Sequence, residues 1–225
     1  MTEPSTVGVI MPVFENASTV ASAIESVLAQ QPPPSEVIVI DGGSRDGTAA
    51  IADGFDGVRV IAQTASGLGQ ARNQGIAAID SGLVAFCDGD DRWTADSLGA
   101  RVRCMDEQQT RAVVGLVVTE AIEGVLPNSR IVGLGQPAIG FTPGALLISR
   151  DALDQIGPFD EHLAVGTDSD WFVRLRQSPI HLAVLDQVVL AKGIRASSLS
   201  TDVETYRRDL LAVARRYVER ERRRE

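Results

Sequence analysis

Short apolar runs alternate with helix-like segments from residue 7 to residue 92, and this alternation limits the fold more than any other feature of the sequence. The runs are Val7–Val13, Glu36–Ile40, Val58–Ala62 and Leu83–Cys87. Between them, apolar side chains recur at helical spacing, and glycine, proline or aspartate marks the transitions. Strands that alternate with helices in this way form a mostly parallel sheet with helices on both faces. The sequence therefore predicts an α/β fold with a Rossmann-like central sheet.

The rest of the chain continues the strand and helix signals less regularly. We expect strands at Ala112–Val118, at Ala145–Ile148 and within His181–Leu190, and helices at Trp93–Glu107, Arg150–Ile156 and Asp168–Gln177. Residues 120–137 have little periodicity, so we expect a loop or hairpin there. From Tyr206 to Tyr217, apolar residues form one stripe at helical spacing, which predicts a last amphipathic helix. A chain of 225 residues is long enough for one domain of this class with a large core.

Acidic side chains follow two of the predicted strands directly. Asp41 comes after one apolar run, and Asp88, Asp90 and Asp91 crowd around Gly89 after another. In open α/β sheets, ligands bind outside the carboxyl ends of the strands. Carboxylates at this density repel one another unless a cation lies among them, and hard oxygen ligands favour magnesium, manganese or calcium. The alternative is an acidic turn that only begins a helix, where carboxylates interact with the helix dipole.

Composition and charge exclude nucleic acid as an expected partner. Aromatic residues make up only 4% of the chain, which is too few for a base-stacking surface. The net charge of −9 also repels DNA and anionic membranes. Hydrophobic residues make up 44% of the chain, so we expect a folded protein with a core.

We expect no targeting signal in this sequence. Residues 1–6 have no basic start, and no apolar stretch approaches the roughly 20 residues of a membrane span. Cys87 and Cys104 belong to no metal or disulfide motif. We therefore expect no transmembrane span and a cytoplasmic location. The arginines of residues 219–225 offer a peripheral contact with anionic lipid, although neighbouring acids dilute their charge and favour a solvated helix end.

Five motifs occur in an order that is typical of one enzyme family. They are VIMPVF at residues 9–14, VIDGGSRDGT at 39–48, GLGQARNQGI at 67–76, FCDGDD at 86–91, and GPFDE at 157–161 followed by TDSDW at 167–171. Through these motifs the chain resembles the family 2 glycosyltransferases over most of residues 7–200. Members of that family have the GT-A fold, use a nucleotide sugar and invert the configuration of the transferred sugar. The resemblance therefore implies an inverting, nucleotide-sugar-dependent glycosyltransferase of the hexosyltransferase class.

The resemblance also implies how the chain is divided. Residues 1–200 would form the GT-A domain, with a nucleotide-binding half over about 7–92 and an acceptor half over about 93–200. Residues 201–225 would form the amphipathic helix, with a frayed basic end. The acceptor would be a carbohydrate, a lipid-linked compound or a small molecule. A homodimer is a further expectation.

The family motifs assign roles to individual residues. The nucleotide-sugar site would consist of Pro12, Phe14, Glu15, Asp41, Arg72, Asp88, Gly89 and Arg195. Asp88 and Asp90 match the Asp-x-Asp motif, which holds Mn²⁺ or Mg²⁺ on the donor diphosphate. Asp168 matches the general base, and Asp170 is the second choice. The resemblance implies that the first strand ends in an aromatic residue that stacks on the base, while a carboxylate accepts a ring N–H. This suits uracil and hence a UDP-sugar donor.

Each role has a structural alternative. In these alternatives Phe14 would pack in the core, Asp41 would only begin a turn, and Arg72 would be a solvated helix residue. Residues 167–170 have the spacing of a capping box, which would leave Asp168 without a special function. Trp171, in the same motif, is expected in the core rather than as a sugar platform.

Three positions depart from the family pattern. Gly42 stands where many members have a second acid, and Thr167 stands where many have a glutamate before the base. Arg195 occupies the position of a C-terminal histidine that can reach the metal or the diphosphate. Arginine cannot ligate a metal, but its guanidinium can bind phosphate oxygens at two points. We hypothesise that Arg195 partly replaces the cation, with a surface arginine as the alternative.

Two other functions are open. The missing glutamate and histidine leave room for a non-catalytic nucleotide-sugar-binding or partner subunit. A sugar-phosphate nucleotidyltransferase is less favoured, because such enzymes rely on lysines near phosphates and this chain has a single lysine, Lys192.

Overall fold

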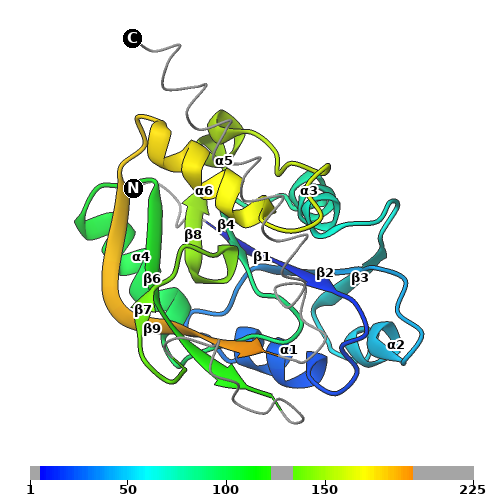
Figure 1. The fold of residues 1–225 in the computed structure, drawn as a ribbon. Helices are drawn as coiled ribbons and strands as arrows, with labels where there is room; N and C mark the ends of the chain where they lie inside the picture. Colours follow the sequence, from blue (N-terminus) through cyan, green and yellow to red (C-terminus); the bar gives the residue numbers. More distant parts are fainter. Residues whose placement is uncertain (1–5, 123–133, 195–225) are drawn as a thin grey trace.

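The computed structural model of the 225-residue chain describes residues 6–122 and 134–194, whose strands form a nine-stranded sheet (Figure 1). Strand and helix alternate throughout the first part: β1 (Val7–Val13), α1 (Val20–Leu28), β2 (Glu36–Asp41), α2 (Thr48–Asp53), β3 (Val58–Ala62), α3 (Leu68–Ala78) and β4 (Leu83–Phe86). Every strand expected here is present, with ends that differ by one residue at most. The predicted alternation is confirmed.

The second part corrects several expectations. It contains β5 (Arg92–Trp93), α4 (Ser97–Glu107), β6 (Ala112–Ala121), β7 (Ala138–Ile139), the 3₁₀ helix η1 (Pro143–Ala145), β8 (Leu146–Ser149), α5 (Arg150–Ile156), α6 (Thr167–Gln177) and β9 (Leu182–Ile194). The helix expected from Trp93 begins only at Ser97, because Trp93 belongs to β5, which pairs with β9. The strand expected within residues 181–190 continues to Ile194, and β6 extends into the expected loop. The expected C-terminal helix lies outside the described residues.

The strand order brings the acidic motifs to one edge of the sheet. The order is β3-β2-β1-β4-β8-β6-β9-β5, and β7 pairs with β6. The strands β1 to β4 are parallel, whereas β8 is antiparallel to both β4 and β6. Parallel strands end at the same edge of a sheet. Asp41 at the end of β2 and Asp88 just after β4 therefore share one rim, as the sequence predicts.

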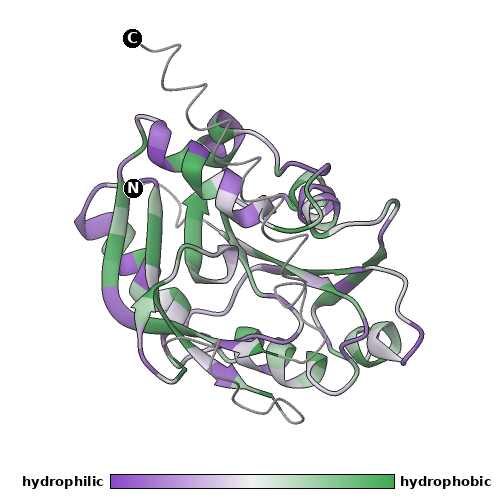
Figure 2. Cartoon of the chain, viewed as in Figure 1, coloured by the Kyte–Doolittle hydropathy of each residue, from purple (hydrophilic) through white to green (hydrophobic). Residues whose placement is uncertain are grey.

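Two hydrophobic cores lie on opposite faces of the sheet. Along β1, Val9 and Met11 belong to one core and Ile10 to the other, because successive side chains of a strand point to opposite faces. Residues of α1, α2 and α4 complete the first core, and residues of α3, α5 and α6 complete the second (Figure 1). The central strands are accordingly hydrophobic along their length (Figure 2).

Helix α3 lies directly on β1, because the contact residue on the helix has no side chain. A Cβ atom on Gly75 would lie 2.3 Å from Cγ2 of Ile10. Arg72 is on the same helix, about one turn earlier. The packing of α3 on β1 therefore sets the position of Arg72.

Candidate active site

The loop after β4 presents three carboxylates beside the end of β1. The N–H of Gly89 donates to the carbonyl oxygen of Pro12 over 3.2 Å, which fastens the loop to that strand. A Cβ atom at position 89 would lie 2.8 Å from the last side chain of β1, so the loop requires glycine there. Asp88 and Asp90 are partly exposed on this loop, whereas Asp91 is buried. The first two carboxylates are therefore accessible to a ligand.

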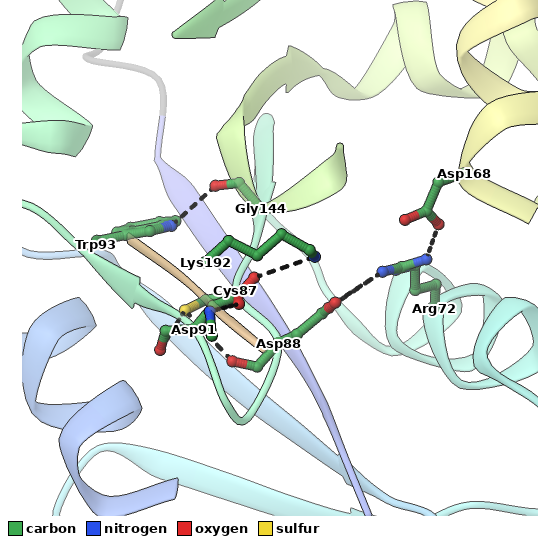
Figure 3. Close-up of polar contacts among 9 residues, drawn as sticks. Arg72, Cys87, Asp88, Asp91, Trp93, Gly144, Asp168 and Lys192 are labelled. Atoms are coloured by element: carbon green, nitrogen blue, oxygen red, sulfur yellow. Dashed lines mark hydrogen bonds and ion pairs between the residues drawn. The ribbon is translucent and has the colours of Figure 1, made fainter. Parts of the chain in front are cut away.

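Arg72 joins the acidic loop to helix α6 (Figure 3). Its Nη2 atom lies 3.1 Å from both carboxylate oxygens of Asp88, and its Nη1 atom donates to Oδ1 of Asp168. The Arg72 side chain is fully buried, which contradicts the alternative of a solvated helix residue. Burial alone would lower the pKa of Arg72, but the charges of Asp168 and Asp88 raise it above the ordinary value. The bridge brings together two acids that are 80 positions apart in the sequence, at residues 88 and 168.

Asp168 lies in the first turn of α6 and keeps part of its surface exposed. Its side chain is 27% exposed, so a small molecule can reach it. The helix is capped by Gly166 without any side-chain hydrogen bond, so the capping-box alternative is wrong. Burial raises the pKa of Asp168 above that of an ordinary aspartate, and Asp88 adds to this, while Arg72 opposes it.

Asp170 has a different environment from Asp168. It is only 2% exposed, and Nε of Arg174 donates to its Oδ2 over 2.9 Å. Trp171 is fully buried against Phe159, with ring centroids 5.3 Å apart, as expected for a core residue. Asp170 is therefore buried and stabilises α6 through Arg174, whereas Asp168 in the same turn is accessible to solvent.

The residues expected to hold a base lie around the ends of β1 and β2. Phe14 is 59% exposed, which contradicts the alternative that it packs in the core. Its ring lies against the backbone of Gly42, where an added Cβ would be 3.2 Å from Cδ2 of Phe14. Asp41 accepts the N–H groups of Gly43 and Ser44 over 3.1 Å. Asp41 thus begins a turn, as the structural alternative expects. The two hydrogen bonds of this turn also fix the orientation of the Asp41 carboxylate.

The family departures can be located only in part. A Cβ atom on Gly42 would also lie 3.1 Å from Oε1 of Gln63, so an acid at this position would require the glutamine side chain to move slightly. Glu15 lies in the same corner and accepts the N–H of Arg45 over 2.9 Å. Arg195 lies outside the described residues, so the hypothesis about it stays a prediction.

Lys192 is a charged residue at the site, and none of the sequence motifs includes it. It lies near the end of β9, and its Nζ atom is 3.8 Å from Oδ2 of Asp91. The charge of Asp91 raises its pKa above the ordinary lysine value, Asp88 and Asp168 add to this, and burial opposes it. The one signal available in the sequence is that Lys192 is the only lysine of the chain.

The acids suit a cation that is shared with a substrate. Within residues 6–122 and 134–194, no group of three or more His, Cys, Asp or Glu side chains is arranged to hold a metal ion. Magnesium-type ions commonly take one or two carboxylates and complete their shell with water and substrate phosphates. Asp88 and Asp90 offer such a pair, and the buried Oδ2 of Asp91 lacks a hydrogen-bond partner among the described residues. The donor set therefore fits Mn²⁺ or Mg²⁺ together with a diphosphate.

A family comparison connects this geometry with known proteins. The model of the family described as glycosyl transferase family 2 matches residues 8–158, which is more than half of the chain. The chain belongs to glycosyltransferase family 2. The matched region includes the acidic loop and Arg72, whereas Asp168 and Lys192 lie beyond it.

Two curated relatives are similar over most of this chain. Glycosyltransferase AglE of Haloferax volcanii is 27% identical over 199 residues, which are 81% of this chain and 65% of AglE. The succinoglycan biosynthesis protein ExoU of Rhizobium meliloti is 28% identical over 230 residues, which are 88% of this chain and 64% of ExoU. The chain therefore spans less than two thirds of the length of these relatives.

The solved structure of S. aureus TarS residues 1-349 in complex with UDP-GlcNAc has the same fold. It matches with a TM-score of 0.70 at 20% identity, over 87% of this chain and 61% of that one. This match confirms the GT-A fold expected for family 2 glycosyltransferases. Among the helices that the structure describes, none has the length and apolar character that crossing a bilayer requires.

Proposed function

We propose that this family 2 glycosyltransferase transfers a sugar from a UDP-sugar to an acceptor hydroxyl with inversion of configuration. The observation that carries the proposal is the Arg72 bridge, which joins Asp88 of the acidic loop to Asp168 of α6. The reaction needs an acid that can bind a metal ion and a base for the acceptor hydroxyl, both within one site. The complex of TarS with UDP-GlcNAc supports a uridine nucleotide as the donor.

Asp168 acts as the general base. The acceptor oxygen forms a bond to the anomeric carbon of the donor while the bond from that carbon to the diphosphate oxygen breaks. The hydroxyl proton goes to Asp168, and the electron pair of the broken bond stays on the diphosphate. A raised pKa makes Asp168 a stronger base than an ordinary aspartate. Attack from the side opposite the diphosphate inverts the configuration.

The acidic rim binds the donor. Asp88 and Asp90 would hold Mn²⁺ or Mg²⁺, and such an ion would stabilise negative charge on the departing diphosphate. Phe14 offers an exposed ring on which uracil stacks, and the carboxylate of Asp41, which the turn orients, accepts a uracil N–H. These contacts orient the anomeric carbon toward Asp168.

A panel of nucleotide sugars tests this proposal. We expect UDP-sugars to raise the melting temperature more than ADP- or GDP-sugars do, and only when Mn²⁺ or Mg²⁺ is present. With an α-linked UDP-sugar and a working acceptor, the product observed by NMR should be β-linked. No stabilisation by any nucleotide sugar would contradict the donor assignment, and an α-linked product would contradict the mechanism.

A binding subunit without activity is the second candidate. Thr167 favours it, because the hydroxyl of Thr167 donates to the carbonyl of Asp160 and gives Asp168 no second carboxylate. Binding of a UDP-sugar without any release of UDP, across a panel of acceptors, would support this candidate. The acceptor class, a homodimer and the cytoplasmic location stay predictions from the sequence.

A further inference from the structure

Lys192 extends toward the acidic loop from an element that the sequence motifs do not cover. It pairs with Thr119 of β6 near the end of β9, far from the donor-binding strands in the chain. Figure 3 shows its side chain beside Asp91, with Asp88 and Arg72 beyond its ammonium end. The lysine is thus placed beside the acidic loop, with its ammonium end on the side of Asp88 and Arg72.

The backbone around Lys192 is fixed against the acidic loop. The N–H of Gly193 donates to Oδ1 of Asp91 over 3.0 Å. A Cβ atom on Gly193 would lie 2.2 Å from the carbonyl oxygen of Asp90, so only glycine permits this approach. Ala191 pairs with Arg92 of β5 on the other side. The backbone of Lys192 is therefore held by the contacts of its neighbours Ala191 and Gly193 and does not depend on its own ammonium group.

The ammonium group itself is loosely held. Its distance of 3.8 Å from Oδ2 of Asp91 is longer than a hydrogen bond, and Asp91 Oδ2 has no hydrogen-bond partner among the described residues. The side chain of Lys192 is 37% exposed. A lysine ammonium carries three N–H donors. These donors are available to a ligand that enters beside Asp88.

Charge balance indicates what kind of ligand this is. Asp88, Asp90 and Asp168 are acids at this site, and the guanidinium of Arg72 is already shared between Asp88 and Asp168. A diphosphate brings further negative charge, which repels these acids unless cations compensate it. Lys192 is paired with Asp91 only at an ion-pair distance of 3.8 Å, so its N–H donors can still bind phosphate oxygens.

We propose that Lys192 binds the diphosphate of the donor and, together with the metal ion, neutralises it as the leaving group. This rests on the proposed function, since it requires a nucleotide diphosphate at the acidic loop. A compact ammonium suits this contact because it acts as a point charge on phosphate oxygens. The diphosphate thus lies between the acidic loop and the end of β9.

Calorimetric titration of UDP and of uridine tests the inference with saturating Mn²⁺ present. Lys192→Gln should weaken UDP binding roughly 10- to 100-fold, as expected for the loss of a charged hydrogen bond. Uridine has no phosphate, so its affinity should not change. Lys192→Arg keeps the charge and should retain most of the UDP affinity.

Arg111→Gln is the matched control, because it also removes one positive charge. Arg111 forms an exposed ion pair with Asp151 and precedes Thr119, the β6 partner of Lys192, by eight residues. At about 3.3 Å per residue, this places it roughly 26 Å away along the strand. Arg111→Gln should leave both affinities unchanged.

The outcomes separate this inference from the proposed function. Equal UDP affinity in Lys192→Gln and wild type would overturn the inference and leave the function intact. Loss of uridine binding together with UDP binding in Lys192→Gln would overturn it as well, because it would show a structural role. Failure of the wild-type protein to bind UDP would overturn the proposed function itself.

Discussion

Asp168 should give activity a characteristic dependence on pH. Its pKa lies above the ordinary aspartate value of about 3.9. A base must be deprotonated to act, so activity should fall as the pH drops through this raised pKa. The acid limb of a kcat/KM profile should therefore lie above the pH at which an ordinary aspartate titrates.

Arg72 should control where that limb lies. Its charge opposes the rise in the pKa of Asp168, so Arg72→Gln should move the acid limb to higher pH. Arg174→Gln is the control, because Arg174 pairs with Asp170 on the same helix. Circular dichroism establishes that the variants are folded, since removal of a buried ion-pair partner commonly costs about 3–5 kcal/mol. An acid limb that is unchanged in Arg72→Gln would contradict the role given to this bridge.

At the residue scale, the sequence indicated the acids better than it indicated the cations. Asp88 and Asp168 stand in recognisable motifs, so both could be proposed without coordinates. The partners of Arg72 could not, because they depend on how α3 and α6 are placed. Lys192 has no local signal, since its place at the site results from the pairing of β9 with β5 and β6.

At the level of elements, the contact of α3 with β1 is the tightest support of the site. Gly75 allows α3 to approach Ile10, and the same helix carries Arg72. Gly75→Ala should destabilise the protein by about 1–3 kcal/mol, because the added methyl group overpacks the core. Denaturant titration measures this cost, and the displaced helix should also lower activity.

Two matched variants isolate the steric cause. Gly54 is the residue after α2. It is exposed, and its φ of −76° is one that alanine also adopts, so Gly54→Ala should change stability by no more than about 0.5 kcal/mol. Adding Ile10→Ala to Gly75→Ala makes room for the methyl group, so the double variant should cost less than the sum of the single changes. Strict additivity would contradict a direct clash.

The two-residue strand β5 shows why the second part of the fold was harder to predict. Trp93 has a helix-like sequence after it, and a strand of two residues has no periodicity of its own. The strand β5 forms because Trp93 pairs with Leu190, which is distant in the sequence. The ends of α4 and β9 therefore depend on each other, and local patterns could not place either.

For the whole molecule, the regular alternation of strand and helix was enough to predict the α/β class. The four strands within residues 7–86 pair with one another in parallel, so their order follows from general rules of connection. The reversed direction of β8 and the long course of β9 have no such rule. The family motifs supplied the GT-A fold where periodicity ended.

Asp91 should leave a measurable mark on the stability of the whole molecule. Burial raises its pKa to about 7, against the opposing charge of Lys192. Between about pH 4 and pH 7 the folded protein therefore keeps a proton that the unfolded chain releases. The stability contributed by this proton is present at low pH and is lost as the pH rises toward 7.

Asp91→Asn removes this titration. The wild-type free energy of unfolding, measured relative to Asp91→Asn in urea, should fall as the pH rises from 5 to 7, by at most about 1.4 kcal/mol per pH unit. The difference is needed because other carboxyl groups, such as Asp46 and Asp151, have lowered pKa values and act in the opposite direction. Parallel pH profiles for the two proteins would show that Asp91 does not hold a proton in the fold.

The most direct test of the proposed site compares Asp168→Asn with Asp170→Asn under saturating UDP-sugar and acceptor. We predict that Asp168→Asn lowers kcat by about a hundred- to ten-thousand-fold and leaves UDP affinity close to wild type. Asp170→Asn should lower stability and keep most of kcat, because Asp170 is buried and paired with Arg174. Wild-type turnover in Asp168→Asn would contradict the assignment of the base and, with it, the single site that Arg72 holds together.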